Sequence, residues 1–235
     1  MKIKKALKTL RKAAKSLYLA NGMEYHNWEH AKRVRKTVRI LYQGPQLRSV
    51  ELAADWHDAF YVPGSVSGFN EKASSDLLNG AYSKIRDRLS PKKQKKMNEI
   101  VMEASSLVCA TSTDMHLYKE TVVLDTLAAL LDADLCALSD NFDDFCTTQS
   151  NILIENNASP FDIENLQKSS EFLFQFLSVR EYIYHTLAAR ERFEVAAKEN
   201  IDRYIAGANS PFAKQLGEHT HTSHTSDDSV TAPLI

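Results

Sequence analysis

Two histidines near the start of the chain have a spacing that suits a shared ligand. Segment 25–30, YHNWEH, places His26 and His30 four residues apart. A helix that includes both would present their side chains about one turn apart, on neighbouring parts of its surface. Such a pair can face one metal ion or one substrate. The same spacing also suits two separate hydrogen-bonded histidines on a helix face.

A second segment, ELAADWHDAFYVPG at 51–64, sets His57 directly beside Asp58 near the end of an expected helix. Neighbours on a helix differ in direction by about 100°, so the two side chains bind one ion only if it lies between their directions. The alternative is a surface Asp near a helix end, with His57 as its partner.

A third segment, VVLDTLAALLDADLCAL at 122–138, is strongly apolar but carries Asp132 and Asp134. Helical spacing places Asp134 on the leucine-rich face, where we expect it to be buried. A buried carboxylate without a partner is costly, so such groups are normally paired with a cation or bound to a metal. An arginine is one candidate partner for Asp134, and a divalent ion shared with the histidines is the other.

Taken together, His30, His57, Asp58 and Asp134 offer two imidazoles and two carboxylates. This mixed set of nitrogen and oxygen donors suits Mn²⁺, Fe²⁺, Co²⁺, Ni²⁺ or Zn²⁺ better than Ca²⁺ or Mg²⁺. Four protein ligands leave room for water on a five- or six-coordinate ion. Such an ion lowers the pKa of bound water and polarises a phosphoryl oxygen.

The elements that must position these residues are helices. Helical periodicity recurs along most of the sequence and strand-like runs of β-branched residues are nearly absent, so we expect an all-α fold. Start signals occur at Asn27, at Asn70 and at the Ser-Pro pairs 90–91 and 159–160. The expected helices span residues 2–20, 27–42, 46–61, 71–89, 91–109, 119–139, 141–156, 161–178 and 180–206.

These helices form one expected domain over residues 1–207, with eight or nine helices. A gap at 62–69, VPGSVSGF, is expected to be a flexible insertion. Residues 208–235 are rich in Ser, Thr and Asp and have no periodic apolar face, so we expect a disordered tail. The HTHTSH run in this tail is a weaker candidate for metal binding than for disorder.

Composition narrows the classes of partner. The 29 Lys and Arg residues nearly cancel the 30 Asp and Glu residues, which argues against an extended nucleic-acid partner or a membrane partner. Three cysteines without a CxxC pair favour a reducing compartment, and no apolar run approaches about 18 residues, so we expect a cytoplasmic protein. The first 23 residues are basic and fit an ordinary first helix, with a targeting or membrane-surface helix as the alternative.

Four motifs in this order resemble the HD-domain superfamily of metal-dependent phosphohydrolases. The resemblance is closer to a small bacterial branch of predicted metal-dependent HD phosphohydrolases, and it spans roughly residues 20–206. The segments that carry it are YHNWEH (25–30), WHDAFY (56–61), NEKAS (70–74) and DADL (132–135). The late segments REYIYHT (180–186) and FEVAAKENIDRYI (193–205) also resemble the last helix of that branch.

The resemblance implies a role for each matching residue. His30, the pair His57 and Asp58, and Asp134 match the metal ligands, whereas His26 matches a proton donor on the substrate side. The implied activity is hydrolysis of a small phosphate mono- or diester by metal-activated water, with nucleotides among the candidate substrates.

Several roles stay open at this point. Glu71, in NEKAS, either orients the attacking water or stabilises the first turn of a helix. His116 either reaches the site or caps a loop. Lys72, Arg33 and Arg35 are candidate phosphate binders, although solvated basic residues are commoner. Two other functions are an HD-type di-iron oxygenase, which needs extra ligands such as His116, and a non-catalytic metal-containing binding or regulatory module.

Overall fold

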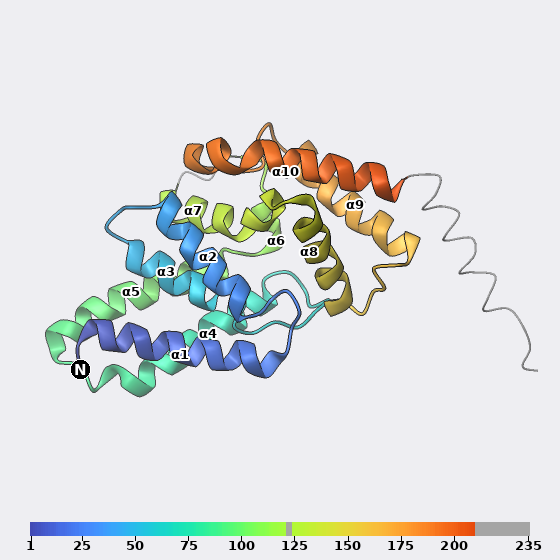
Figure 1. Cartoon of the computed structure of the whole chain (residues 1–235). Coiled ribbons are helices and arrows are strands. Elements are labelled where there is room, and N and C mark those ends of the chain that lie inside the picture. Colours follow the sequence, from blue (N-terminus) through green and yellow to red (C-terminus); the bar gives the residue numbers. More distant parts are fainter. Residues whose placement is uncertain (121–123, 210–235) are drawn as a thin grey trace, which may run out of the picture.

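The computed structural model describes residues 1–120 and 124–209. Over these residues the chain is helical and contains no strand, so the all-α prediction is confirmed (Figure 1). Ten α-helices and one 3₁₀ helix, η1, are described, against the eight or nine expected. They are α1 Ile3–Asn21, α2 Trp28–Leu41, α3 Leu47–Trp56, α4 Phe69–Arg86, α5 Pro91–Cys109, α6 Thr113–His116, α7 Asp125–Asp134, η1 Leu135–Ser139, α8 Phe142–Glu155, α9 Ile163–Ser178 and α10 Leu187–Ala208.

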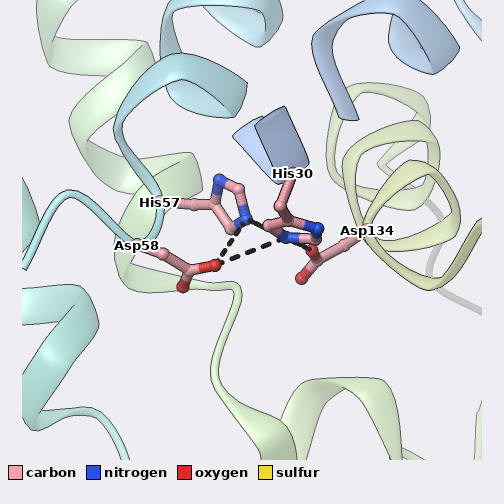
Figure 2. Close-up of side chains that lie close together, drawn as sticks. All are labelled: His30, His57, Asp58 and Asp134. Carbon is pink, nitrogen blue, oxygen red and sulfur yellow. Dashed lines mark hydrogen bonds and ion pairs between the residues drawn. The ribbon is translucent and has the colours of Figure 1, made fainter. Parts of the chain in front are cut away.

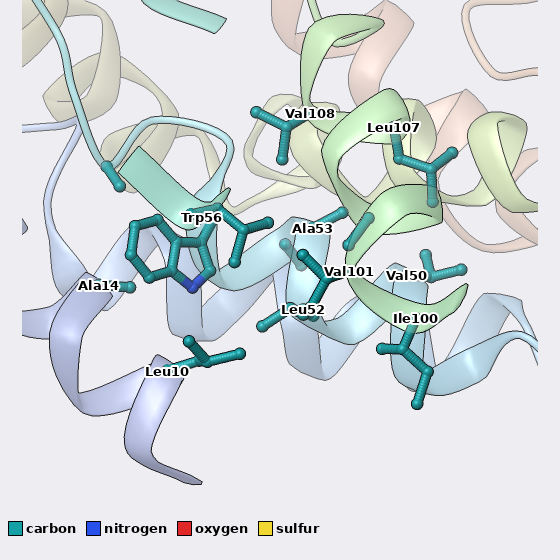
Figure 3. Close-up of a cluster of buried hydrophobic side chains, with 14 of the residues drawn as sticks. Leu10, Ala14, Val50, Leu52, Ala53, Trp56, Ile100, Val101, Leu107 and Val108 are labelled. Carbon is teal, nitrogen blue, oxygen red and sulfur yellow. The ribbon is translucent and has the colours of Figure 1, made fainter. Parts of the chain in front are cut away.

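Within residues 1–120 and 124–209, buried apolar side chains form two clusters. The first cluster contains residues of α1, α2, α3, α4, α5 and α7. Figure 3 shows its centre, where Trp56 of α3 lies between Leu10 and Ala14 of α1 and the valines of α5. The second joins η1, α8, α9 and α10, with Phe145 and Phe176 among its members. The candidate site lies between the two clusters, as described below.

The basic N-terminal helix packs as an ordinary first helix. Ala6, Leu10, Ala14 and Tyr18 lie on its buried face. Residues three and four apart share a helix face, so this spacing is enough to attach α1 to the first cluster while its lysines stay on the other faces. Within the described residues, no helix combines the length and apolar character that crossing a membrane requires.

Three expected helix bounds are wrong near the candidate site. Helix α3 ends at Trp56 rather than at 61, so His57 and Asp58 lie in the turn that follows it. Helix α7 covers Asp125–Asp134 of the expected 119–139, and residues 135–139 tighten into η1. Helix α10 begins at Leu187 rather than at 180. Residues 121–123 lie outside the described part.

Two of the expected caps are also wrong. Asn70 does not cap α4, which begins at Phe69; its side chain instead accepts from the backbone N–H of Val62 and donates to the Val62 carbonyl. Helix α9 starts at Ile163, where Asp162 accepts from the N–H of Glu164. The predicted tail at 208–235 lies almost wholly outside the described residues, and α10 continues to Ala208, one residue past the expected domain boundary.

Candidate metal centre

The first candidate ligand, His30, is positioned by the start of α2. The side chain of Asn27 accepts from the backbone N–H groups of Glu29, at 2.9 Å, and of His30, at 3.2 Å. This predicted N-cap is therefore confirmed, and it places His30 in the first turn of the helix with its side chain buried. His26 precedes the cap, so the two histidines do not share a helix face.

The adjacent pair His57 and Asp58 lies directly after the end of α3. His57 is fully buried, and its Nδ1 lies 3.0 Å from the carbonyl of Ala54. Since a carbonyl can only accept, Nδ1 carries a hydrogen, and Nε2 is the ring nitrogen that faces the cluster. The backbone N–H of Asp58 donates to the Tyr18 hydroxyl at 3.2 Å, which ties this turn to α1.

The four predicted ligands converge, as Figure 2 shows. The Nε2 atoms of His30 and His57 are 3.1 Å apart. Asp58 Oδ2 lies 2.8 Å from His57 Nε2 and 3.5 Å from His30 Nε2, and Asp134 Oδ1 lies 3.2 Å and 3.0 Å from the same two atoms. One donor atom from each residue lies within 4.8 Å of all the others.

These separations fit one bound ion. Ligand bonds of about 2.0 to 2.1 Å place adjacent donors roughly 2.9 Å apart in octahedral geometry and roughly 3.4 Å apart in tetrahedral geometry. The contacts that His57 Nε2 makes with the other donors, 2.8 to 3.2 Å, fall close to this range. The group could therefore hold a divalent ion, and its nitrogen and oxygen donors suit a transition metal.

The charged groups of the cluster shift one another's pKa values. Burial alone would lower the pKa of His57, but the nearby carboxylates Asp58 and Asp134 outweigh it, so the pKa of His57 lies well above its usual value. Burial would raise the pKa of Asp58 and of Asp134, but the His57 charge and hydrogen bonds from the histidines hold both below their usual range. Such mutual stabilisation of opposite charges keeps the carboxylates ionised. An ion bound here would replace the histidine proton as their positive partner, because a ligating imidazole must be neutral.

His116 also belongs to the site. Its Nε2 lies 3.1 Å from Oδ2 of Asp134, the oxygen that does not face His30 and His57. The side chain is buried and is presented by the short helix α6, which no sequence pattern indicated. Asp134 is thus shared between the four-residue cluster and His116.

Asp132, two residues earlier on α7, has a different environment. It is fully buried and accepts from the backbone N–H groups of His185 and Thr186, each at 2.7 Å. Burial is the largest influence on this carboxyl and raises its pKa. Asp132 therefore holds the segment before α10, whereas Asp134 faces the cluster.

His26 is held by a residue that the sequence did not single out. Glu155, at the end of α8, accepts from the backbone N–H of His26 at 2.9 Å, and its Oε2 lies 2.5 Å from His26 Nδ1. The His26 ring stacks on Tyr61 at 3.7 Å and lies 6.1 Å from the His30 ring, measured between centroids. Glu155 follows the apolar run ILI at a helix end, which is too common a pattern to mark a functional residue.

Hydrogen bonds outweigh burial at Glu155. Burial would raise the pKa of this carboxyl, but the hydrogen bonds from His26 and from the backbone lower it on balance. Glu155 is therefore ionised near neutral pH, and the Nδ1 of His26 is its donor. The arrangement leaves Nε2 of His26 as the ring nitrogen available to a ligand.

A cavity of about 180 Å³ adjoins the cluster. Its titratable lining residues are the carboxyl groups of Asp58, Glu71 and Asp134, the imidazoles of His26 and His116, and the tyrosines Tyr25 and Tyr61. Glu71 is half-buried, and burial is the main cause that raises its pKa, with the charge of Asp58 acting in the same direction. The two predicted catalytic residues, His26 and Glu71, thus line the same cavity as the candidate ligands Asp58 and Asp134.

The candidate phosphate-binding cations do not reach this cavity. Lys72 pairs with Asp76 on the exposed side of α4, Arg33 pairs with Asp140, and Arg35 pairs with Asp55. Among the described residues, no Lys or Arg side chain lines the cavity. The suggestion that one of these three binds substrate phosphate is not supported by their positions.

Comparison of the chain with known protein families, with curated proteins and with solved structures gives no match. The resemblance to HD-domain phosphohydrolases therefore stays a prediction from four short motifs. The support for the candidate site is the arrangement of its own side chains in the structure.

Proposed function

We propose that this chain is a metal-dependent phosphohydrolase that cleaves a phosphate mono- or diester. The observation that carries the proposal is the shared cavity, which His26 and Glu71 line together with the candidate ligands Asp58 and Asp134. A divalent ion bound by the cluster would polarise a phosphoryl oxygen and lower the pKa of a water molecule. The cavity then supplies the two proton-transfer groups that such a hydrolysis also needs.

His26 and Glu71 have complementary roles in the proposed reaction. A water oxygen forms a bond to phosphorus while the bond from phosphorus to the leaving oxygen breaks. Glu71 accepts the proton of the attacking water, and its raised pKa makes it a stronger base than an exposed carboxylate. His26 donates a proton from Nε2 to the leaving oxygen, and the Glu155 carboxylate stabilises the positive imidazolium before the transfer.

A second candidate function is favoured by the position of His116. Asp134 directs one oxygen to His30 and His57 and the other to His116, so this carboxylate could bridge two ions. Two bridged iron ions would suit an oxygenase of the HD type. That function predicts two irons per chain and oxygen consumption with a suitable substrate, and His116→Ala should lose the second iron and the oxygen consumption. A binding or regulatory module with a structural metal predicts one ion and no turnover.

Metal analysis of purified variants tests the assignment of roles. We expect one divalent ion per chain in the unaltered protein and loss of the ion in His57→Ala and in Asp58→Ala. We expect His26→Ala to keep the ion but to lose about 100-fold or more in turnover, because the proton donor is gone. The exposed carboxylate Asp87 provides a matched control, and Asp87→Ala should change neither quantity.

Turnover is measured with a panel of nucleotides and simple phosphoesters after loading with Mn²⁺, Ni²⁺ or Co²⁺. Release of phosphate or of the alcohol that depends on the added ion supports the proposal. A protein that binds the ion but cleaves no phosphoester, and that instead consumes oxygen when loaded with iron, would show that the oxygenase alternative is correct. If His26→Ala loses the ion, the separation of ligands from proton donor is wrong.

A further inference from the structure

The cavity beside the cluster has two chemically different walls. Its titratable residues come from α4, α6, α7 and the segments that flank α2 and α3. The other wall is apolar and is formed by η1, α8 and α9. These elements contribute the side chains of Leu135, Leu138, Ile152, Phe172, Leu173 and Phe176. Several of these belong to the second apolar cluster, so this wall is part of a packed core and not a chance surface patch.

The charge of the lining limits the ligand. Asp58, Glu71 and Asp134 contribute three carboxyl groups, and no described Lys or Arg side chain lines the cavity. A divalent ion would compensate two of the three charges and the proposed His26 imidazolium the third, which leaves no excess of positive charge. Nucleoside di- and triphosphates carry three or four negative charges and are normally bound by Lys, Arg or backbone N–H groups. The cavity offers them no such cation, so it suits a head group of low charge.

The size of the cavity limits the ligand further. Its volume is about 180 Å³. An apolar protein cavity of about 150 Å³ accommodates benzene. A single ring or a short branched chain therefore fills most of this space, whereas a base and its ribose together would extend out of its open side into solvent.

We propose that the cavity selects phosphoesters of a compact apolar alcohol or phenol, about the size of one ring, in preference to nucleotides. This inference rests on the proposed function for the phosphoester head group. The apolar wall binds the organic part of the substrate while the phosphorus centre lies at the cluster. The leaving oxygen then lies on the side of the cavity that His26 lines.

Phe172 is the side chain best placed to test the apolar wall. It is 42% exposed, so its removal leaves the core of α9 in place, and its ring meets Phe176 edge-on with centroids 5.6 Å apart. Phe174 offers a matched control on the same helix. It is 55% exposed and does not line this cavity.

The test measures binding of non-hydrolysable phosphonates to the full chain by titration calorimetry in the presence of Mn²⁺. Phenylphosphonate and methylphosphonate carry the same head group and differ only in the apolar part. We expect phenylphosphonate to bind about tenfold more tightly than methylphosphonate, because its ring is removed from water. We also expect it to bind more tightly than ATP. Phe172→Ala should reduce the tenfold ratio severalfold, and Phe174→Ala should leave it unchanged.

Binding and turnover separate this inference from the proposed function. Equal affinity for the two phosphonates, no binding of phenylphosphonate, or a preference for ATP overturns the inference about the cavity. An unchanged ratio in Phe172→Ala overturns the assignment of the apolar wall. If the phenyl preference is present but aryl phosphates are not hydrolysed, the cavity is assigned correctly and the hydrolase proposal fails. If phosphoesters are hydrolysed without a phenyl preference, only the cavity inference fails.

Discussion

At the scale of single residues, the site separates two histidines that look equivalent in the sequence. His30 lies in the first turn of α2 with its Nε2 in the cluster, whereas His26 precedes the cap and is held by Glu155. Asn27 causes the separation, because its side chain starts the helix between them. Four residues of spacing therefore correspond to two environments and not to one shared ligand face.

The His26–Glu155 contact leads to a prediction about catalysis. Replacing the carboxylate in Glu155→Gln removes the charge that stabilises the His26 imidazolium, so fewer molecules carry the proton that His26 is proposed to donate to the leaving oxygen. We expect kcat to fall about 10- to 100-fold while KM and metal content change little. Steady-state kinetics and metal analysis measure these quantities.

Glu181→Gln, an exposed substitution, serves as the control for that prediction and should have no effect. Glu155 acts through His26, so it is a positioning residue. A merely structural role for Glu155 would lower the folded fraction and leave kcat per folded, metal-loaded molecule unchanged. That outcome would contradict the assignment.

The convergence of four ligands could be predicted because each has a recognisable local signal. Asp134 lies on a leucine-rich helix face, and His57 and Asp58 are adjacent in a segment with a buried side. Glu155 could not be found in this way. It is 129 residues from His26, and only the tertiary packing of α8 brings the two together.

At the scale of elements, the helices were predictable but several ends were not. Helix α3 ends early because the Nδ1–H of His57 donates to the carbonyl of Ala54 and Asp58 donates its N–H to Tyr18. These two hydrogen bonds take the place of the next helical backbone hydrogen bond. The spacing of apolar residues in the sequence gives no sign of either. His57 itself keeps right-handed helical backbone angles, and its Nε2 still lies 2.8 Å from Oδ2 of Asp58.

The segment before α10 departs from helical periodicity for a similar reason. Residues 180–186 were expected to begin the helix. In the structure, Glu194 accepts from the backbone N–H groups of Ile183 and Tyr184, and Asp132 accepts from those of His185 and Thr186. Two buried carboxylates thus satisfy four donors that a helix would otherwise have used.

Asp132 should therefore be important for stability. Asp132→Ala leaves two buried N–H groups without an acceptor, and each such group costs about 1 to 3 kcal/mol. We expect the free energy of unfolding to fall by roughly 2 to 5 kcal/mol, measured by urea denaturation. The control Asp202→Ala removes an exposed carboxylate from α10 and should change stability by less than about 0.5 kcal/mol. A loss in Asp132→Ala no larger than in the control would show that the segment finds other acceptors.

At the scale of the whole molecule, the candidate metal centre links parts of the chain that are distant in sequence. Its ligands come from α2, from the turn after α3 and from the end of α7. The adjoining cavity extends from this cluster to η1, α8 and α9, which pack in the second apolar cluster. The cavity is therefore lined by elements of both apolar clusters. Periodicity predicts the individual helices well, but it contains no information about which faces of distant helices meet.

A ligand set that forms only in the folded chain should couple metal binding to stability. An ion that binds the native state and not the unfolded chain stabilises it by about 2.7 kcal/mol when its concentration is 100 times Kd. For a domain of this size, roughly 2 to 4 °C per kcal/mol gives an increase in Tm of roughly 5 to 10 °C. We expect this increase on adding Mn²⁺, Ni²⁺ or Co²⁺ to chelator-treated protein, measured by scanning calorimetry.

Variants distinguish the cluster from the histidines of the C-terminal segment. His57→Ala and Asp58→Ala should abolish the increase in Tm, because each removes a ligand and leaves the remaining charges unbalanced. Combined replacement of His219, His221 and His224 by alanine should preserve it, since the proposal assigns the ion to His30, His57, Asp58 and Asp134. If the increase instead disappears in the C-terminal variant and persists in His57→Ala, the ion binds outside the four-residue cluster. The catalytic roles proposed for His26 and Glu71 would then lose their basis, because their position beside bound substrate depends on an ion at that cluster.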